Sequence, residues 1–227
     1  MEITEEQKIA RIKNRKRTNI LHKPEFFVIE YLCKILPMWM TPNVLTGIGF
    51  FGSLVAFIGI LMAIENKYYF ILSVIGLGIQ WFGDSLDGRI AYYRNSPRKW
   101  YGWVLDMNLD WVSTALIAIG IYFYFEDYKF MAIFFLSGYG LTYILAVMRY
   151  KITDIYLIDA DGLLGPTELR ILTCVAFLGE IFIPNFFFVF GVIATVVVNI
   201  INFFDFQRIL KLADERDKRE LAEKGDQ

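Results

Sequence analysis

The chain has 227 residues, 56% of them hydrophobic and 21% charged, and its mean hydropathy is positive. Such a composition indicates an integral membrane protein with small polar extensions. With one histidine, His22, and two distant cysteines, Cys33 and Cys174, the chain offers poor zinc ligands and no redox pair. The net charge of −1 points to no particular partner, and we expect no nucleic-acid ligand.

Residues 1–23 form a polar, basic arm, which either lies against anionic lipid or is simply solvated. A cleavable signal peptide is not expected, because this long charged arm precedes the first apolar run. Residues 24–40 mix charged and apolar side chains and are too short to span a bilayer. We predict an amphipathic helix in the membrane interface there, with Pro24 in its first turn and Trp39 as an aromatic anchor.

Six apolar segments follow, and each is long enough to cross the hydrocarbon core as a helix. Their predicted bounds are 43–64, 69–92, 102–125, 128–149, 166–183 and 185–207. Residues 41–207 are therefore expected to fold as a six-helix membrane domain, and residues 208–227 as a charged cytoplasmic tail. The predicted fold is an all-α integral membrane protein, with six transmembrane helices preceded by an interfacial amphipathic helix.

Basic residues are distributed unevenly between these segments, and their distribution predicts the topology. The loops after the second and fourth segments, the arm and the tail contain most of the Lys and Arg residues. The remaining loops contain only Lys67 and Lys129. Because loops rich in Lys and Arg face the cytoplasm, both termini and the loop after the second segment are predicted to be cytoplasmic.

Four aspartates flank the loop between the second and third segments. Asp84 and Asp87 are three residues apart, and Asp106 and Asp110 are four residues apart. On helices, these spacings place both members of a pair on one face. The connecting loop is long enough for the two helices to lie antiparallel. We therefore expect the four carboxylates to meet on the cytoplasmic side of the bundle.

Such a cluster needs compensation, because carboxylates near hydrocarbon are costly and repel one another. Two hard divalent ions, Mg²⁺ or Mn²⁺, suit oxygen ligands at this density. Gly88 and Gly102 leave room for a ligand or a neighbouring helix against the backbone. Other interpretations remain open. The aspartates could pair with buried cations or serve a cation or proton transporter, and the glycines could be packing notches.

Metal-binding carboxylates at a membrane favour chemistry on a phosphate-bearing substrate, because metals polarise phosphoryl oxygens and a carboxylate can accept a proton. The motif resembles that of the CDP-alcohol phosphotransferases (CDP-alcohol phosphatidyltransferases), D-x2-D-G-x2-A-R, eight or nine residues, G-x3-D-x3-D. The matching residues are Asp84, Asp87, Gly88, Ala91, Gly102, Asp106 and Asp110. Thr41-Pro42-Asn43-Val44-Leu45-Thr46 is similar to the T-P-N-x-x-T that enters the first span of many members. An amphipathic helix before six spans is the family architecture as well.

The resemblance implies an enzyme of phospholipid biosynthesis and a role for each matching residue. Asp84, Asp87 and Asp106 would hold two Mg²⁺ or Mn²⁺ ions, and Asp110 would complete the site and act as general base. The base would deprotonate an acceptor hydroxyl, which attacks the β-phosphorus of the CDP-linked donor and releases CMP. The donor-binding positions would be Gly88, Ala91, Gly102, Asn43 and Thr46. Members of the family commonly form homodimers.

One position departs from the signature. Tyr92 stands where the motif has an arginine, whose charge would lie near the donor phosphates. Arg94 is the nearest substitute and is included among the donor-binding residues, with Arg89 and Arg98 as alternatives. Otherwise, Tyr92 marks a weakened family member that still binds a CDP-lipid.

The identities of the donor and the acceptor stay open. Gly165-Pro166-Thr167-Glu168-Leu169-Arg170 has the proline and acid of an ordinary helix start. The same residues resemble the choline/ethanolamine branch, in which the donor is a CDP-aminoalcohol and the acceptor is diacylglycerol. In the other branch, the donor is CDP-diacylglycerol and the acceptor is a small alcohol. Arg149, Lys151 or Arg170 could bind a phosphorylated acceptor, whereas Glu168 could favour an amine.

Overall fold

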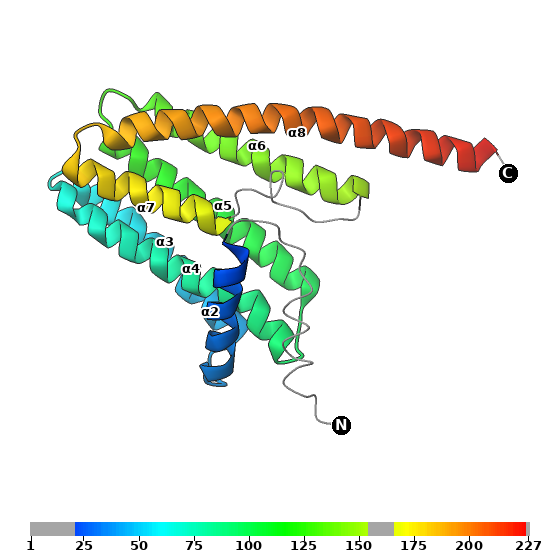
Figure 1. Cartoon of the computed structure of the whole chain (residues 1–227), viewed down its shortest axis with the longest axis horizontal. Coiled ribbons are helices and arrows are strands. Elements are labelled where there is room, and N and C mark those ends of the chain that lie inside the picture. The colour runs from blue at the N-terminus through cyan, green and yellow to red at the C-terminus, as the bar shows by residue number, and fades with distance from the viewer. Residues whose placement is uncertain (1–20, 154–165, 226–227) are drawn as a thin grey trace.

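The computed structural model describes residues 21–153 and 166–225, and this part of the chain is helical throughout, without a β-strand. Its elements are α2 (His22–Ile35), α3 (Pro42–Ala63), the short 3-10 helix η1 (Lys67–Tyr69), α4 (Phe70–Tyr93), α5 (Lys99–Tyr124), α6 (Phe130–Thr153), α7 (Pro166–Phe182) and α8 (Phe186–Gly225). Figure 1 shows α3 to α8 running lengthwise beside one another, with α2 lying across them. The predicted all-α class is confirmed.

Five segments of the described residues are long and apolar enough to cross a membrane. They are Pro42–Ala63, Lys67–Tyr93, Lys99–Tyr124, Phe130–Thr153 and Phe186–Ala222. These lengths and compositions indicate a multi-pass membrane protein. α7 has 17 residues and is not among the five. The predicted crossing at 166–183, and with it the total of six, therefore stays a prediction.

α3 and α4 pack closely because glycines line their contact. A Cβ atom on Gly52 would lie 2.6 Å from the carbonyl oxygen of Gly76, and a Cβ on Gly76 would lie equally close to that of Gly52. Backbone atoms at this distance cannot give way, so glycine is required at both positions. The hydroxyl of Ser73 also donates to the carbonyl of Ala56 at 3.0 Å. The two helices therefore form one rigid unit.

An aromatic cluster and a buried carboxylate hold together the starts of α4 and α8 and the ends of α5 and α7. The ring of Phe70 lies 5.0 Å from that of Phe177 and 5.7 Å from that of Phe187, between centroids. Glu180 accepts hydrogen bonds from the backbone N–H of Phe187 at 2.7 Å and from the hydroxyl of Tyr124 at 3.3 Å. These contacts satisfy the buried carboxylate and fix the positions of all four helices.

α2 presents apolar side chains on two sides. Ile29 and Cys33 are buried in a cluster with Leu45, Leu86 and Ile90 of α3 and α4. The other side exposes Phe27, Tyr31 and Ile35. Such a helix suits the membrane interface, which is where we predict residues 24–40 to lie. Burial raises the pKa of the Cys33 thiol to about 11, against the opposing charges of nearby arginines, so the thiol stays protonated at neutral pH.

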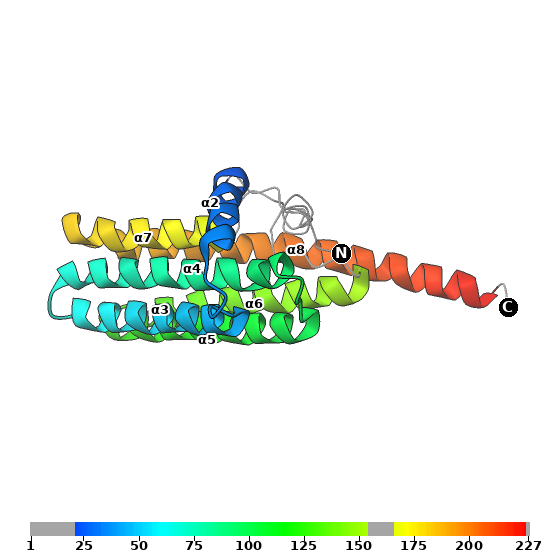
Figure 2. The same ribbon diagram turned by 90° about the horizontal axis from the view of Figure 1, so that it is seen from below.

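α8 is one continuous helix of 40 residues. Figures 1 and 2 show its second half projecting past the ends of the other helices, so the charged tail continues the last helix. Arg216 donates to the carbonyls of Lys151 and Ile152 at 2.7 and 3.0 Å, which caps the end of α6. The ion pair between Lys218 and Asp214 spans one turn of the exposed part of α8, on either side of Arg216.

Candidate active site

α3, α4 and α5 enclose a small cleft, and all four predicted aspartates line it. The lining residues are Thr46, Gly49, Phe50, Gln80, Asp84, Asp87, Asp106, Leu109, Asp110 and Ser113. Spacings of three and four residues place each aspartate pair on one face of its helix, and the antiparallel α4 and α5 turn these faces toward each other. The two pairs therefore meet in space, as the sequence pattern predicts.

The turn between α4 and α5 makes this meeting possible. α4 ends with the N–H of Ser96 donating to the carbonyl of Ala91 at 2.9 Å. Asn95, within this turn, has a φ of 56°, a left-handed conformation that asparagine tolerates better than most residues. The chain then reverses and begins α5 at Lys99.

Thr46 and Arg170 make hydrogen bonds to the two aspartates of α4. The hydroxyl of Thr46 lies 2.7 Å from Oδ2 of the buried Asp87 and 2.9 Å from the carbonyl oxygen of Pro42. Arg170 of α7 forms an ion pair with Asp84 at 2.5 Å, with both side chains largely shielded. Thr46 therefore links α3 to α4, and Arg170 places a positive charge inside the acidic cluster.

Asp110 faces α6. The side chain of Tyr143 lies close to the Asp110 carboxylate. The ring of Tyr143 packs against Tyr139 at 5.4 Å and against Trp111 at 6.4 Å, between centroids. Sequence reasoning missed Tyr143. Its only signal is the spacing of four from Tyr139, which puts both rings on one face of a helix without saying what that face contacts.

In the Gly-Pro-Thr-Glu segment, Thr167 and Glu168 make contacts that hold helices together. Gly165 lies outside the described residues. Glu168 accepts a hydrogen bond from the backbone N–H of Leu21 at 2.8 Å, and Thr167 bonds to Glu25 at 3.1 Å. Figure 1 shows the start of α2 beside the start of α7, where these contacts form. Pro166 opens α7 and Glu168 lies in its first turn, which agrees with an ordinary helix start. Within this segment, Arg170 reaches the aspartates through its ion pair with Asp84.

Arg94, the expected substitute for the motif arginine, makes its hydrogen bonds to backbone carbonyls. Its guanidinium donates to the carbonyls of Met40, Pro37 and Leu36 at 2.7, 2.9 and 3.0 Å. These carbonyls belong to the turn between α2 and α3, and both terminal nitrogens are engaged there. The side chain of Arg94 therefore fastens α2 to this turn, and its role in donor binding stays a prediction.

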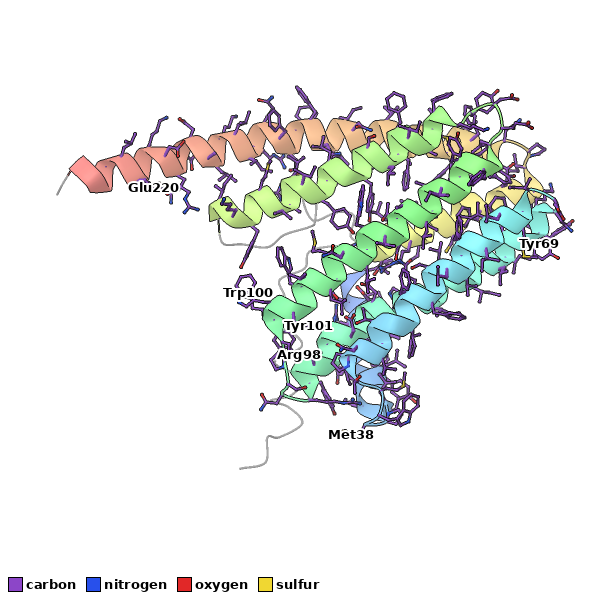
Figure 3. All side chains as sticks on the ribbon, turned by 180° about the vertical axis from the view of Figure 1, so that it is seen from behind. Met38, Tyr69, Arg98, Trp100, Tyr101 and Glu220 are labelled. Atoms are coloured by element: carbon purple, nitrogen blue, oxygen red, sulfur yellow. The ribbon has the colours of Figure 1, made fainter. Side chains whose placement is uncertain are left out.

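Another arginine lies on the side of the site where α3 begins. Arg98 donates to the side-chain oxygen of Asn43 at 2.7 Å, and its guanidinium lies 4.1 Å from the centroid of the Tyr101 ring. The amide of Asn43 also donates to the hydroxyl of Tyr101 at 3.4 Å. Figure 3 shows Arg98 and Tyr101 together at the end of α5. Asn43 thus stands beside a fixed, exposed positive charge.

The motif positions without bulky side chains differ in how open they are. No heavy atom of another segment lies within 4 Å of a Cβ built on Gly88 or on Gly102. Both positions therefore leave open space beside the backbone, and neither is needed for helix packing. Ala91 is buried in the bundle, whereas Tyr92, in the position of the motif arginine, is half-buried.

The donor set fits divalent hard cations in kind. Four carboxylates and a threonine hydroxyl line one cleft and offer oxygen atoms only, the ligands that Mg²⁺ and Mn²⁺ prefer. Within residues 21–153 and 166–225, no three His, Cys, Asp or Glu side chains are already oriented around a common point that could hold a metal. Asp84 faces Arg170 and Asp87 faces Thr46, so rotation of these side chains would be needed to share ions.

Comparison with known proteins agrees with this geometry. The chain is similar to the cholinephosphotransferase 1 proteins of Danio rerio and Homo sapiens, with 27% identity over 149 residues and 25% over 154 residues. These alignments cover 56% and 60% of this chain but 37% of each relative. The chain therefore matches little more than a third of the length of these curated relatives.

The family comparison covers most of the membrane domain. The model for CDP-alcohol phosphatidyltransferases matches residues 39–202, which include the four aspartates, the open glycines and the Thr46 hydroxyl. The match thus extends over well more than half of the chain, from the turn before α3 to α8. The chain is an enzyme of the CDP-alcohol phosphatidyltransferase family.

Proposed function

We propose that this enzyme transfers a substituted phosphate from a CDP-alcohol to a hydroxyl acceptor and releases CMP, in phospholipid biosynthesis. The observation that carries the proposal is the cleft in which Asp84, Asp87, Asp106 and Asp110 come together within the family match. A cytoplasm-facing site agrees with the basic loops on that side, and the proposal includes six spans with both termini cytoplasmic.

Asp84, Asp87 and Asp106 are proposed to hold two Mg²⁺ or Mn²⁺ ions, with Asp110 completing the set. When bound, such ions neutralise a diphosphate and polarise its phosphoryl oxygens. The residues of the chain prepare this binding. Thr46 orients the Asp87 carboxylate, and Arg170 offsets the mutual repulsion of the acids around Asp84.

Asp110 is proposed as the general base that takes the proton of the acceptor hydroxyl. Asp110 lines the cleft and lies close to Tyr143 of α6, so its carboxylate is placed where an acceptor hydroxyl could enter. The deprotonated oxygen attacks the β-phosphorus of the donor, the bond from that phosphorus to the CMP oxygen breaks, and CMP leaves. Arg170, beside Asp84, is positioned to share its charge with the departing phosphate.

The cytidine diphosphate is proposed to lie along the open side of α4 and α5. Gly88 and Gly102 leave space for it, and Asn43 and Thr46 supply polar groups from α3. Arg98, which is bonded to Asn43, takes over the charge that the motif arginine would provide. With Arg98 in this role, a cation remains near the donor phosphates although Tyr92 replaces the motif arginine.

We propose a CDP-aminoalcohol as donor and a diacylglycerol as acceptor, and a homodimer embedded in membrane lipid as the working form. The support for the donor is the similarity to cholinephosphotransferase 1 proteins and the Pro166-Thr167-Glu168 segment. A CDP-diacylglycerol donor is the alternative within the same family. The identity of the lipid product distinguishes the two donors.

The test is CMP release by the purified protein, with CDP-choline, CDP-ethanolamine and CDP-diacylglycerol each offered with pooled acceptors and the product identified by mass. Release should require Mg²⁺ or Mn²⁺ and an acceptor. Asp110→Asn should lower kcat about 100-fold or more while donor binding is kept, because a general base contributes roughly that much. Normal turnover by this variant would remove Asp110 from the base role.

Two other activities would show themselves in the same preparation. A cation or proton transporter would move ions across proteoliposomes without releasing CMP. A silent relative that only binds the CDP-lipid would bind donor without turnover, and Tyr92→Arg would then increase CMP release strongly. Four carboxylates, a threonine and an arginine come together at one end of α4 and α5, which favours the transferase over a transporter, whose pathway would need polar residues at several depths.

A further inference from the structure

Three aromatic side chains outside the aspartate cleft form a compact group between α5 and α6. The ring centroids of Trp100 and Trp103 lie 6.3 Å apart, those of Trp100 and Tyr150 6.2 Å apart, and those of Trp103 and Tyr150 6.0 Å apart. The three rings thus form a nearly equilateral triangle. Figure 3 shows Trp100 on the side of α5 that faces the end of α6, whereas Arg98 and Tyr101 lie on the other side. We call these three residues the aromatic triangle.

The aromatic triangle is next to the proposed reaction site. Trp103 is three residues before Asp106 and seven before Asp110, so all three lie on one face of α5. Tyr150 is seven residues after Tyr143, which lies close to Asp110, and it shares the face of Tyr143 on α6. Along the antiparallel pair, Trp103 meets Tyr150 about two turns from the contact of Asp110 with Tyr143. The rise from Asp106 to Trp103 is only about 4.5 Å, one turn of helix.

The three rings stand at 89°, 63° and 39° to one another, so they are arranged as walls and not as a stack. An ammonium or a methylated ammonium is attracted to an aromatic face within about 6 Å of the ring centroid. A cation about 3 Å above the centre of a triangle of this size lies roughly 5 Å from all three centroids. The ammonium of Lys99, the residue before Trp100, lies 5.2 Å from the centroid of the Trp100 ring. Trp100 is 60% exposed, so this ring is accessible from the cytoplasmic end of α5.

We propose that Trp100, Trp103 and Tyr150 bind the quaternary ammonium group of the donor's alcohol. The inference rests on the proposed transferase function. It specifies how the alcohol part of the donor is recognised, which that function leaves open. In a CDP-linked aminoalcohol, the ammonium follows the β-phosphorus after one oxygen and two carbons. This short linkage allows one donor to place its phosphate near Asp106 and its cation near Trp103, one helix turn away.

The aromatic triangle then favours a fully methylated ammonium. Aromatic faces have no strong hydrogen-bond acceptor, so they bind a weakly hydrated, methylated cation better than a primary ammonium, which loses its water without replacement. The other explanation is an aromatic belt at the membrane interface, in which the rings would anchor the bundle without touching substrate. The two explanations differ in substrate preference, which an anchor does not affect.

The test compares CDP-choline with CDP-ethanolamine as donors, in the full-length protein in detergent or nanodiscs, and takes the ratio of their kcat/KM values. Trp103→Leu and Tyr150→Leu should each lower this ratio about tenfold, and Trp103→Phe should retain most of it, because a ring remains. Trp39→Leu is the matched control, since Trp39 is an exposed tryptophan outside the aromatic triangle and should keep the wild-type ratio. An unchanged ratio in both leucine variants would overturn the proposal and leave the transferase function intact.

A second measurement uses binding alone and does not depend on turnover. Tetramethylammonium chloride should quench the tryptophan fluorescence of the wild-type protein in a saturable manner, compared with sodium chloride of equal ionic strength, and the quenching should be lost in Trp103→Leu. Saturable quenching with no CMP release from any donor would contradict the transferase function but support the cation site. Equal quenching in wild type and Trp103→Leu would reject the site.

Discussion

Gly83→Ala tests the close packing that places the acidic residues. Gly83 precedes Asp84, and a Cβ added there would lie 2.6 Å from the Cα atom of Gly49, which belongs to the backbone and cannot rotate away. Overpacking of this kind costs about 1–3 kcal/mol, and the better helix propensity of alanine returns at most about 1 kcal/mol. For a chain of this length, a net loss of about 1–2 kcal/mol lowers Tm by about 2–8 °C.

Gly78→Ala is the matched control on the same helix. No heavy atom of another segment lies within 4 Å of a Cβ at Gly78, so the added methyl should leave Tm unchanged or raise it slightly. Both variants are to be measured by thermal unfolding in one detergent, followed by tryptophan fluorescence. Gly83→Ala should also lower CMP release well below its Tm, since α4 must move relative to Thr46. Equal melting temperatures for the two variants would refute the close contact of α3 and α4.

Three further substitutions separate ligand binding from stability. Gly88→Ala should raise the donor KM about tenfold or more with an unchanged Tm, because its Cβ would meet bound donor and no protein atom within 4 Å. Arg98→Gln should raise the donor KM about tenfold, measured as the donor dependence of CMP release, because it removes the charge beside Asn43. Arg94→Gln should instead lower Tm and leave the donor KM unchanged, since its hydrogen bonds go to carbonyls of the turn before α3. A raised KM in Arg94→Gln with an unchanged Tm would reverse these two assignments.

Local patterns in the sequence are enough to predict most helices and the meeting of the aspartates. The segment predicted at 43–64 is α3, Pro42–Ala63, and the one predicted at 102–125 is α5, Lys99–Tyr124. Both predictions rest on runs of apolar residues, which are local information. The meeting of the aspartate pairs follows from helix periodicity and one short connection. It could therefore be predicted without knowing which other helices line the cleft.

Contacts between distant segments could not be predicted in this way. Arg170 reaches Asp84 across 86 positions, and Tyr143 reaches Asp110 from another helix. Which face of α6 or α7 turns toward the cleft depends on how the bundle packs, and apolar helices in a membrane have no polar outer face to reveal it. The contacts of Arg94 could not be predicted for a related reason. Proximity to the motif in sequence does not show that its side chain bonds to the turn between α2 and α3.

The distribution of these residues over the helices bears on how one fold handles different substrates. The groups proposed for phosphate chemistry lie mainly on α4 and α5, and α4 is fixed to α3 by contacts that admit no side chain. A reaction that needs carboxylates in fixed positions benefits from such a rigid pair. The groups proposed to recognise the alcohol, in contrast, lie where α5 meets α6. Replacing a few rings there would change which alcohol fits without moving Asp106 or Asp110, so donor preference could change while the chemistry stays the same.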